Sequence, residues 1–270
     1  MRSSAASDVY KRQKYSDGRI KINYHQDATL GTELENIQQL KTGEIDIGHF
    51  ADNFGSQIAT GIDPTVIPFI FKDIDDVKAV YDDPVLGAAI KDAAKSTANC
   101  YLIGLQERTP RLLTASKEIK TPADLNGVKV RVPEIPDWVT VWNSLGALCT
   151  VVAWSETYSA LQTGVVDAQE NPIDNIFTNK IFEVNKYIMN TEHLLGLHHW
   201  CINADTYDNM DPADQEILQR AFDEANAWGD AELESLADGY WKEVLADGSV
   251  TVVDAVSYTH LRAHETTLHL

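Results

Sequence analysis

Strand-like and helix-like stretches alternate along this chain, and the alternation limits its possible folds more than any other feature. "RIKINYH" (19–25) has the two-residue period of a strand, and "TELENIQQLKTG" (32–43) has apolar residues at helical spacing before Gly43. "EIDIGHF" (44–50) returns to the strand period. This order predicts an α/β architecture with largely parallel sheets.

The rest of the chain continues the same rhythm. We expect strands at 100–106, 128–132, 150–154 and 165–168, and helices at 73–96 (a pair), 137–147, 156–163 (capped by Ser155 and ended by Gly164) and 210–245. Asp211 and Pro212 open the last of these, which is either one long helix or a helix pair.

Composition indicates a globular chain. Of its 270 residues, 44% are hydrophobic and 23% are charged, and this length permits one large domain or two lobes. No apolar run approaches the roughly eighteen residues of a membrane span. The net charge of −19 argues against nucleic acid as a partner, because nucleic acids attract basic surfaces. The net charge does not exclude a small anionic ligand, since a few arginines in a cleft outweigh distant, screened carboxylates.

The cysteines and the chain ends offer little chemistry. Cys100, Cys149 and Cys201 match no zinc or redox spacing, so we expect buried apolar side chains, with one disulfide as the alternative. Residues 1–13 lack the apolar segment of a signal peptide, and residues 257–270 concentrate histidines with no strand or helix to frame them. We expect both ends to be foreign to the fold, with a histidine-rich metal tail as the alternative at 257–270.

Three carboxylates gather in "SETYSALQTGVVDAQENP" (155–172). Glu156, Asp167 and Glu170 could include the acid and base of a hydrolase, serve as cap and turn residues, or belong to a pocket that holds a ligand unchanged. Glu156 fits the first turn of a helix, where the helix dipole favours a carboxylate. Asp167 and Glu170 follow an expected strand end. The sequence contains none of the enzyme motifs G-x-S-x-G, H-E-x-x-H, G-x-x-x-x-G-K-[ST] and G-x-G-x-x-G. Their absence weakens the support for a hydrolase.

Three stretches together carry a family resemblance. "RLLTASKEIKTPADLNGVKVRVPE", "LGALCTVVAWSETYSALQTGVVDAQENP" and "FEVNKYIMNTEHLLG", with their spacings, resemble the DctP-like solute-binding proteins of tripartite ATP-independent periplasmic (TRAP) transporters. The resemblance runs from about Gly18 to Asp254. It implies a two-lobe, periplasmic-binding-protein-like α/β fold, with a ligand cleft between the lobes and a long connecting helix.

The resemblance also implies where the lobes lie. It assigns residues 14–108 and 197–236 to lobe I, and residues 109–196 and 237–256 to lobe II. Compared with the family, the chain lacks the signal peptide and the first strand and helix of lobe I, and it stops before the final helices. We therefore expect a fold that is truncated at both ends.

Four residues match the family's main ligand-binding positions. Arg131 matches its carboxylate-binding arginine, since a guanidinium grips a carboxylate with two parallel hydrogen bonds; the alternative is a salt bridge to a nearby acid. Arg111 matches a second such position, with a surface arginine as the alternative. Asn171 matches a residue that hydrogen-bonds the ligand. Trp154 matches an aromatic residue that packs on the ligand, unless it is a core tryptophan.

Further candidates rest on weaker matches. His198 and Trp200 align with a region that lines the cleft, although either could belong to the core. Glu33 follows "LGT", where family members often contact the ligand, and Glu134 could accept hydrogen bonds from the hydroxyls of a polyol acid. Glu170 is expected to brace Arg131 or the hinge, because like charges in a dry cleft repel.

The resemblance implies a periplasmic substrate-binding subunit, not an enzyme. It captures a small organic acid and hands it to membrane permease subunits, as a monomer, with no cofactor and no metal of its own. "QERTPRLLTAS", with Trp154, Glu134 and His198, favours a hydroxylated acid such as a uronate over a plain dicarboxylate. The alternative is a sugar-acid-processing enzyme that uses Asp167 and Glu170.

Overall fold

The computed structural model describes residues 15–26, 28–246 and 248–254, and the chain divides into two compact units. The first comprises the described residues up to Asp63 together with Ala79–Arg108 and Leu197–Leu233. The second comprises Pro64–Lys78, Thr109–Gly196 and the described residues from Glu234 onward. Residues 64–78 thus belong to the second unit, whereas the resemblance assigns them to lobe I. Both terminal segments expected to be foreign lie outside the described residues.

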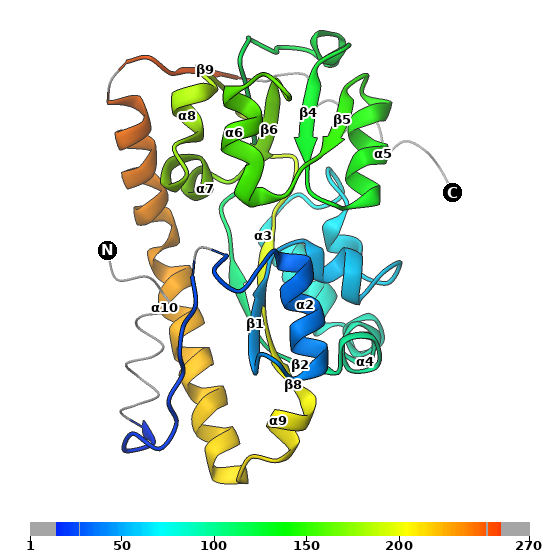
Figure 1. The fold of residues 1–270 in the computed structure, drawn as a ribbon, viewed down its shortest axis with the longest axis vertical. Helices are drawn as coiled ribbons and strands as arrows, with labels where there is room; N and C mark the ends of the chain where they lie inside the picture. Colours follow the sequence, from blue (N-terminus) through cyan, green and yellow to red (C-terminus); the bar gives the residue numbers. More distant parts are fainter. Residues whose placement is uncertain (1–14, 27, 247, 255–270) are drawn as a thin grey trace. The chain divides into compact units, whose positions relative to one another are not determined.

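The first unit is built on an antiparallel sheet in the order β1-β8-β2 (Figure 1). Its strands are β1 (Ile47–Phe50), β2 (Cys100–Glu107) and β8 (Leu197–Asn203), and its helices include α2 (Glu33–Thr42), α4 (Leu86–Ala98), α9 (Ala204–Asp208) and the first part of α10 (Pro212–Leu245), with the π-helical turn Phe54–Ile58. α2 forms as the sequence predicts, because Thr32 closes a capping box with Glu35. Gly43 then ends this helix in the left-handed conformation, with a φ of 79°.

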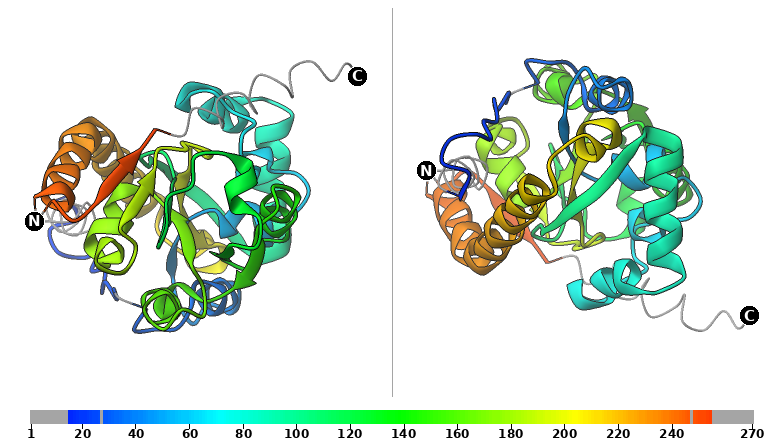
Figure 2. Two further views of the ribbon diagram at one scale, coloured as in Figure 1. Left: turned by 90° about the horizontal axis from the view of Figure 1, so that it is seen from above. Right: turned by 90° about the horizontal axis from the view of Figure 1, so that it is seen from below.

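The two faces of this sheet bury different side chains. On β8, Trp200 and Ile202 join a core with Leu218 and Phe222 of α10. His199 lies on the other face, since side chains alternate along a strand. The view from below in Figure 2 shows α10 and α4 on opposite sides of the sheet. The long helix expected from Pro212 is one continuous helix of 34 residues.

The second unit is built on a mixed sheet in the order β5-β4-β6-β3-β7-β9. Its strands are β3 (Leu112–Ala115), β4 (Lys129–Val132), β5 (Leu148–Val151), β6 (Ala168–Asn171), β7 (Tyr187–Met189) and β9 (Thr251–Val253). Its helices are α5 (Pro136–Ser144), α6 (Thr157–Gln162), α7 (Ile173–Thr178) and α8 (Ile181–Val184). It also contains 3-10 turns at Pro64–Val66, Pro122–Leu125 and Trp154–Glu156. The helix α3 (Ile74–Asp82) contributes residues to both units.

Alternation along the strands also separates two cores in this unit. Leu113 of β3 and Met189 of β7 pack with Trp138 and Trp142 of α5. Their neighbours in sequence pack on the opposite face, with α6, α7, α8 and the end of α10. The view from above in Figure 2 shows helices on both sides of this sheet. A sheet covered on both faces leaves its strand ends as the places where polar side chains can be exposed to a ligand.

The predicted strand direction is wrong for the first unit and incomplete for the second. β8 is antiparallel to both β1 and β2. In the second unit, β4 is parallel to β5 and β6, and β7 to β9, but β3 is antiparallel to both its neighbours. The predicted alternation of helices and strands is present. Whether two strands run parallel or antiparallel, however, depends on pairing between segments that are far apart in the sequence. Local periodicity carries no information about those partners.

Three local expectations also need correction. Residues 19–25 form no strand. Residues 21–25 line a cavity of about 500 Å³ together with β1, and β8 is the only strand partner of β1 in the described chain. Ser155 lies inside a 3-10 turn, and the side chain of Glu156, the residue that caps α6, makes no capping hydrogen bond. The strand expected at 165–168 is β6 at Ala168–Asn171, so Glu170 lies within a strand instead of after one.

The cysteines are free thiols. Cys100 and Cys201 are buried, as the sequence predicts, whereas Cys149 is half-buried. Burial raises the pKa of Cys149 to about 11, so this thiol stays protonated and unreactive near neutral pH. Among the helices that the structure describes, none is both long enough and apolar enough to cross a membrane.

Candidate functional site

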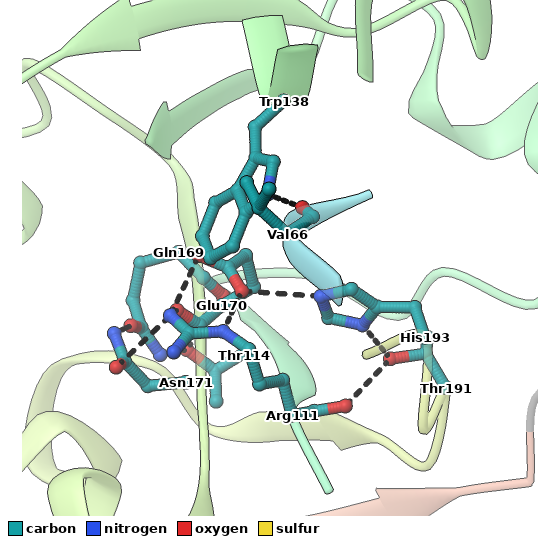
Figure 3. A network of polar contacts seen from close by, with 9 residues as sticks. All are labelled: Val66, Arg111, Thr114, Trp138, Gln169, Glu170, Asn171, Thr191 and His193. Carbon is teal, nitrogen blue, oxygen red and sulfur yellow. Dashed lines mark hydrogen bonds and ion pairs between the residues drawn. The ribbon is translucent and has the colours of Figure 1, made fainter. Parts of the chain in front are cut away.

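A buried ion pair joins Arg111 to Glu170 in the second unit (Figure 3). β3 and β6 pair with Leu112 opposite Asn171, so Arg111, directly before β3, lies beside the end of β6. Its Nε donates to Oε2 of Glu170 at 2.5 Å and its Nη2 to Oε1 at 3.0 Å. This two-point contact fixes the plane of the guanidinium.

The pair decides the charge state of Glu170. Burial alone raises the pKa of this carboxyl, but the Arg111 guanidinium and a hydrogen bond from His193 outweigh burial and bring the pKa to about 2. Glu170 is therefore ionised throughout the physiological range and cannot serve as a general acid. The sequence predicts that Glu170 braces Arg131 or the hinge; its partners are Arg111 and His193.

Asn171 extends the contact into a chain of buried amides and hydroxyls. Its Oδ1 accepts from Nη2 of Arg111 at 3.1 Å, and its Nδ2 donates to Gln169 at 2.7 Å. Gln169 in turn donates to the hydroxyl of Thr114 at 2.9 Å. These bonds orient the Asn171 amide, since its carbonyl end faces the guanidinium and its amino end faces Gln169.

Arg131 lies in the same unit with partners of another kind. The register of β4 sets it opposite Gln169 on one side and Thr150 on the other. Its Nε donates to the main-chain oxygen of Val152 at 2.9 Å, and its guanidinium lies 5.5 Å from the centroid of the Trp154 ring. This is within the range of a cation–π contact. Trp154 is half-buried and also packs against the core of the α6 face.

Two predicted residues of the first unit meet around a histidine that the sequence analysis did not select. His198 and Trp200 lie on one face of β8, and β1 places His49 opposite Trp200. The His49 ring stacks on Trp200 at 3.9 Å and meets His198 edge-on at 4.2 Å. Burial, together with Arg108 and His199, lowers the pKa of His49 to about 3, so the ring is neutral near pH 7.

Glu33 is fixed by two hydrogen bonds at the start of α2. Its carboxylate accepts from the Ala51 N–H at 2.7 Å and from Nδ2 of Asn53 at 2.7 Å. Burial raises the pKa of Glu33, and these two bonds oppose the rise. Within the described chain, the buried Oδ1 of Asn53 has no hydrogen-bond partner. A buried acceptor without a partner costs free energy of folding.

Comparison with known proteins gives these arrangements a context. The model of the DctP family, described as bacterial extracellular solute-binding protein, family 7, matches residues 8–267. A solute-binding protein of Roseobacter denitrificans is 33% identical over 209 residues, which cover 76% of this chain and 63% of that protein. The chain belongs to this solute-binding family.

Two solved structures of TRAP periplasmic solute-binding proteins share the fold. The protein from Sulfitobacter sp. NAS-14.1, with bound β-D-galacturonate, superposes with a TM-score of 0.88 at 27% identity, covering 97% of this chain and 88% of its own. The protein from Chromohalobacter salexigens, with bound D-glucuronate, gives 0.89 at 25% identity, covering 96% and 86%. The family match extends into both terminal segments expected to be foreign, over residues 8–13 and 257–267.

The other candidate carboxylates of this solute-binding protein lie in turns and beside strand ends. Oδ2 of Asp167 accepts from the main-chain N–H of Lys129 at 3.0 Å. Asp167 lies in a bend directly before β6 and contacts Lys129, whereas Glu170 lies within β6 and contacts Arg111 and His193, so the two carboxylates share no partner. This geometry speaks against their use as one acid–base pair. Glu134 is exposed after β4, and Glu156 lies in the turn before α6.

His49 and His193 are the residues that sequence reasoning missed. "EIDIGHF" predicts the strand but not that His49 faces Trp200, because that register depends on a strand about 150 residues later. His193 follows Thr191 in a segment without helix or strand. Its neighbours Asn190, Thr191 and Glu192 are polar as well, so no local signal in the sequence distinguishes this histidine.

Proposed function

We propose that this protein captures a small carboxylate-bearing sugar acid outside the cytoplasm, in the periplasm, and delivers it to the membrane subunits of a TRAP transporter. The observation that carries the proposal is the group in the second unit: two buried arginines, an oriented amide and an indole. Guanidinium groups in a buried setting bind carboxylates far better than water-exposed ones do.

A uronate is the ligand class that we favour. Similar proteins hold β-D-galacturonate and D-glucuronate. In this chain Arg131 is proposed to grip the carboxylate, with Trp154 against the apolar face of the sugar and Asn171 and Arg111 as further donors. A role as a monomeric binding protein without catalysis belongs to the same proposal.

Thermal unfolding of the chain with candidate ligands tests the proposal. D-glucuronate and D-galacturonate are expected to raise the Tm by several degrees, because a ligand that binds only the folded state stabilises it. Succinate should raise it less, and D-glucose, which has the ring without the carboxylate, should leave it unchanged. Equal shifts with glucose and glucuronate would contradict carboxylate capture.

Mass spectrometry separates binding from chemistry. After prolonged incubation the recovered D-glucuronate is expected to be unchanged in mass and amount. Conversion in proportion to protein concentration would instead support the enzyme alternative.

A further inference from the structure

A chain of polar side chains in the second unit runs from Asn185, directly after α8, to Asn171 at the end of β6. Nδ2 of Asn185 donates to the main-chain oxygen of Asp167 at 3.1 Å, and its Oδ1 accepts from the hydroxyl of Thr114 at 3.1 Å. That hydroxyl accepts from Nε2 of Gln169 at 2.9 Å, and Oε1 of Gln169 accepts from Nδ2 of Asn171 at 2.7 Å (Figure 3). One hydroxyl group thus joins three amides.

The strand register and the core hold this chain in place. Thr114 lies opposite Gln169 where β3 pairs with β6, and the main-chain N–H of Asn185 donates to the last turn of α8. Thr114 and Gln169 are fully buried, and Asn171 and Asn185 are at most 4% exposed. Water therefore does not compete for these hydrogen bonds, and each polar atom depends on its neighbour in the chain.

The main-chain oxygen of Asp167 fixes the direction of every bond. A carbonyl only accepts, so the amino end of Asn185 faces Asp167 and its carbonyl end faces Thr114. The hydroxyl of Thr114 has a single hydrogen, which it donates to Asn185, so it can only accept from Gln169. The carbonyl end of Gln169 is then left for the amino end of Asn171.

The reverse orientation of the Asn171 amide is unfavourable at both ends of the chain. Its amino end would face Nη2 of Arg111, which now donates to Oδ1 at 3.1 Å, so two donors would meet. Gln169 would have to turn as well and take the hydrogen of Thr114, which leaves the buried Oδ1 of Asn185 without its donor. Each of these changes costs free energy, because a buried polar group loses its partner.

We propose that Thr114 is a positioning residue that fixes which end of the Asn171 amide faces Arg111. After the bonds of the chain are made, Asn171 keeps a second lone pair on Oδ1 and a second hydrogen on Nδ2. A sugar hydroxyl, which both donates and accepts, then finds these two groups in constant positions, so binding does not first have to order the amide. The role rests on the proposed function, in which Asn171 is a ligand donor.

Two substitutions separate the hydroxyl from the rest of the side chain. Thr114→Val keeps the β-branched shape but removes the hydroxyl, whereas Thr114→Ser keeps the hydroxyl. The readouts are the Kd for D-glucuronate by calorimetry and the two side-chain ¹⁵Nδ2–¹H resonances of Asn171 without ligand, assigned with Asn171→Asp. Thr178→Val is the matched control, because it removes an exposed hydroxyl that donates to the main-chain oxygen of Asp174 in the same unit.

Thr114→Val is expected to weaken D-glucuronate binding about fivefold and to move or broaden the Asn171 resonances, because the amide is no longer held in one orientation. Thr114→Ser should stay within about twofold of the parent, and Thr178→Val should change neither readout. Unmoved Asn171 resonances in Thr114→Val would overturn the proposal. So would equal losses of affinity in the Val and Ser variants, which would indicate packing alone.

Failure of the proposed function can be told apart from failure of this inference. If the parent chain binds no sugar acid, the proposed function fails. The Asn171 resonances, which are recorded without ligand, still show whether Thr114 fixes the amide. Movement of these resonances in Thr114→Val but not in Thr114→Ser would support the positioning role even then.

A second variant covers the case in which Thr114→Val does not fold. Asn185→Leu removes only the far end of the chain, and the main-chain oxygen of Asp167 keeps the N–H of Ser116 as a donor. The Thr114 hydroxyl can then turn to the main-chain oxygen of Gln169, 3.4 Å away. A smaller shift of the same resonances is therefore expected, and no shift would overturn the proposal.

Discussion

Arg111 and Arg131 are buried alike in one unit, with 4% and 3% of their surfaces exposed, yet their partners differ in kind. Arg111 is paired with the fully buried carboxylate of Glu170. The Nε of Arg131 donates to a main-chain oxygen, and its guanidinium faces an indole ring. A buried carboxylate partner makes an arginine part of the fold, because neither charge tolerates loss of the other.

The comparison shows that equal burial accompanies two different kinds of arginine partner, and we propose that this difference marks Arg131 as the ligand-binding arginine. The main-chain oxygen of Val152 orients the Arg131 guanidinium, and the aromatic face of Trp154 shields it from water. We therefore expect changes around Arg111 to alter folding first, and changes around Arg131 to alter ligand affinity first.

The largest effect is expected for Glu170→Gln. It leaves the Arg111 charge buried without its carboxylate, so the free energy of unfolding should fall by about 3–5 kcal/mol. Urea unfolding measures this loss. Glu118→Gln, which breaks the exposed pair with Lys120, is the control and should cost less than about 1 kcal/mol. Equal losses in both variants would remove the basis of the comparison.

Acid should act through the same carboxylate. The folded-state pKa of Glu170 is about 2, below its ordinary value of 4.5, so its contribution is complete above about pH 4.5 and is lost as the pH falls toward 2. The contribution is roughly 3 kcal/mol. Unfolding measured from pH 6 to pH 2 should therefore show a steeper loss in the parent than in Glu170→Gln. Parallel pH profiles would contradict this assignment.

Arg131→Lys should separate binding from folding. An ammonium group cannot reproduce the planar two-point grip, so D-glucuronate affinity is expected to fall about thirtyfold, or about 2 kcal/mol. The Tm without ligand should change by no more than a few degrees. Calorimetry and thermal unfolding measure the two quantities, with the exposed Arg220→Lys as control. Unchanged affinity would exclude Arg131 as the carboxylate anchor.

The smallest effect is expected for Trp154→Leu. It removes the aromatic face beside Arg131 but keeps an apolar side chain, so affinity should fall about fivefold, or about 1 kcal/mol. Titration with D-glucuronate measures the loss, and Trp228→Leu, at a partly exposed tryptophan of α10, is the control. A loss in the control as large as in Trp154→Leu would contradict a specific role.

The sequence predicts elements well where their signals are local. Thr32, Glu35 and Gly43 define both ends of α2, and Pro212 opens the long helix. Strand direction and register are not local, so the parallel sheet expected for the first unit is wrong. Residues 19–25 likewise have the two-residue period of a strand, but this period does not show whether a neighbouring strand is present to pair with them.

In the candidate site, too, local motifs identify residues, whereas the contacts between those residues depend on strand pairing. Arg131, Arg111 and Asn171 are identified from motifs, and the contact between Arg111 and Asn171 follows from a strand pairing that motifs do not contain. The expectation that Glu170 braces Arg131 or the hinge follows from repulsion between Glu170 and an anionic ligand, which identifies no partner, whereas the β3–β6 register sets Glu170 beside Arg111. His193 reaches Glu170 across 23 positions of chain, a distance over which no periodic pattern operates.

β1 has a further consequence for the protein in concentrated solution. Within the described chain only β8 pairs with it, and a cavity of about 500 Å³ lies along its other side. Unpaired main-chain donors and acceptors of an edge strand are a template for another polypeptide. Self-association should therefore grow with concentration, and the high negative charge opposes it only while salt is low, because screening weakens the repulsion between chains. Colloidal stability in this protein thus depends on ionic strength as much as on the fold.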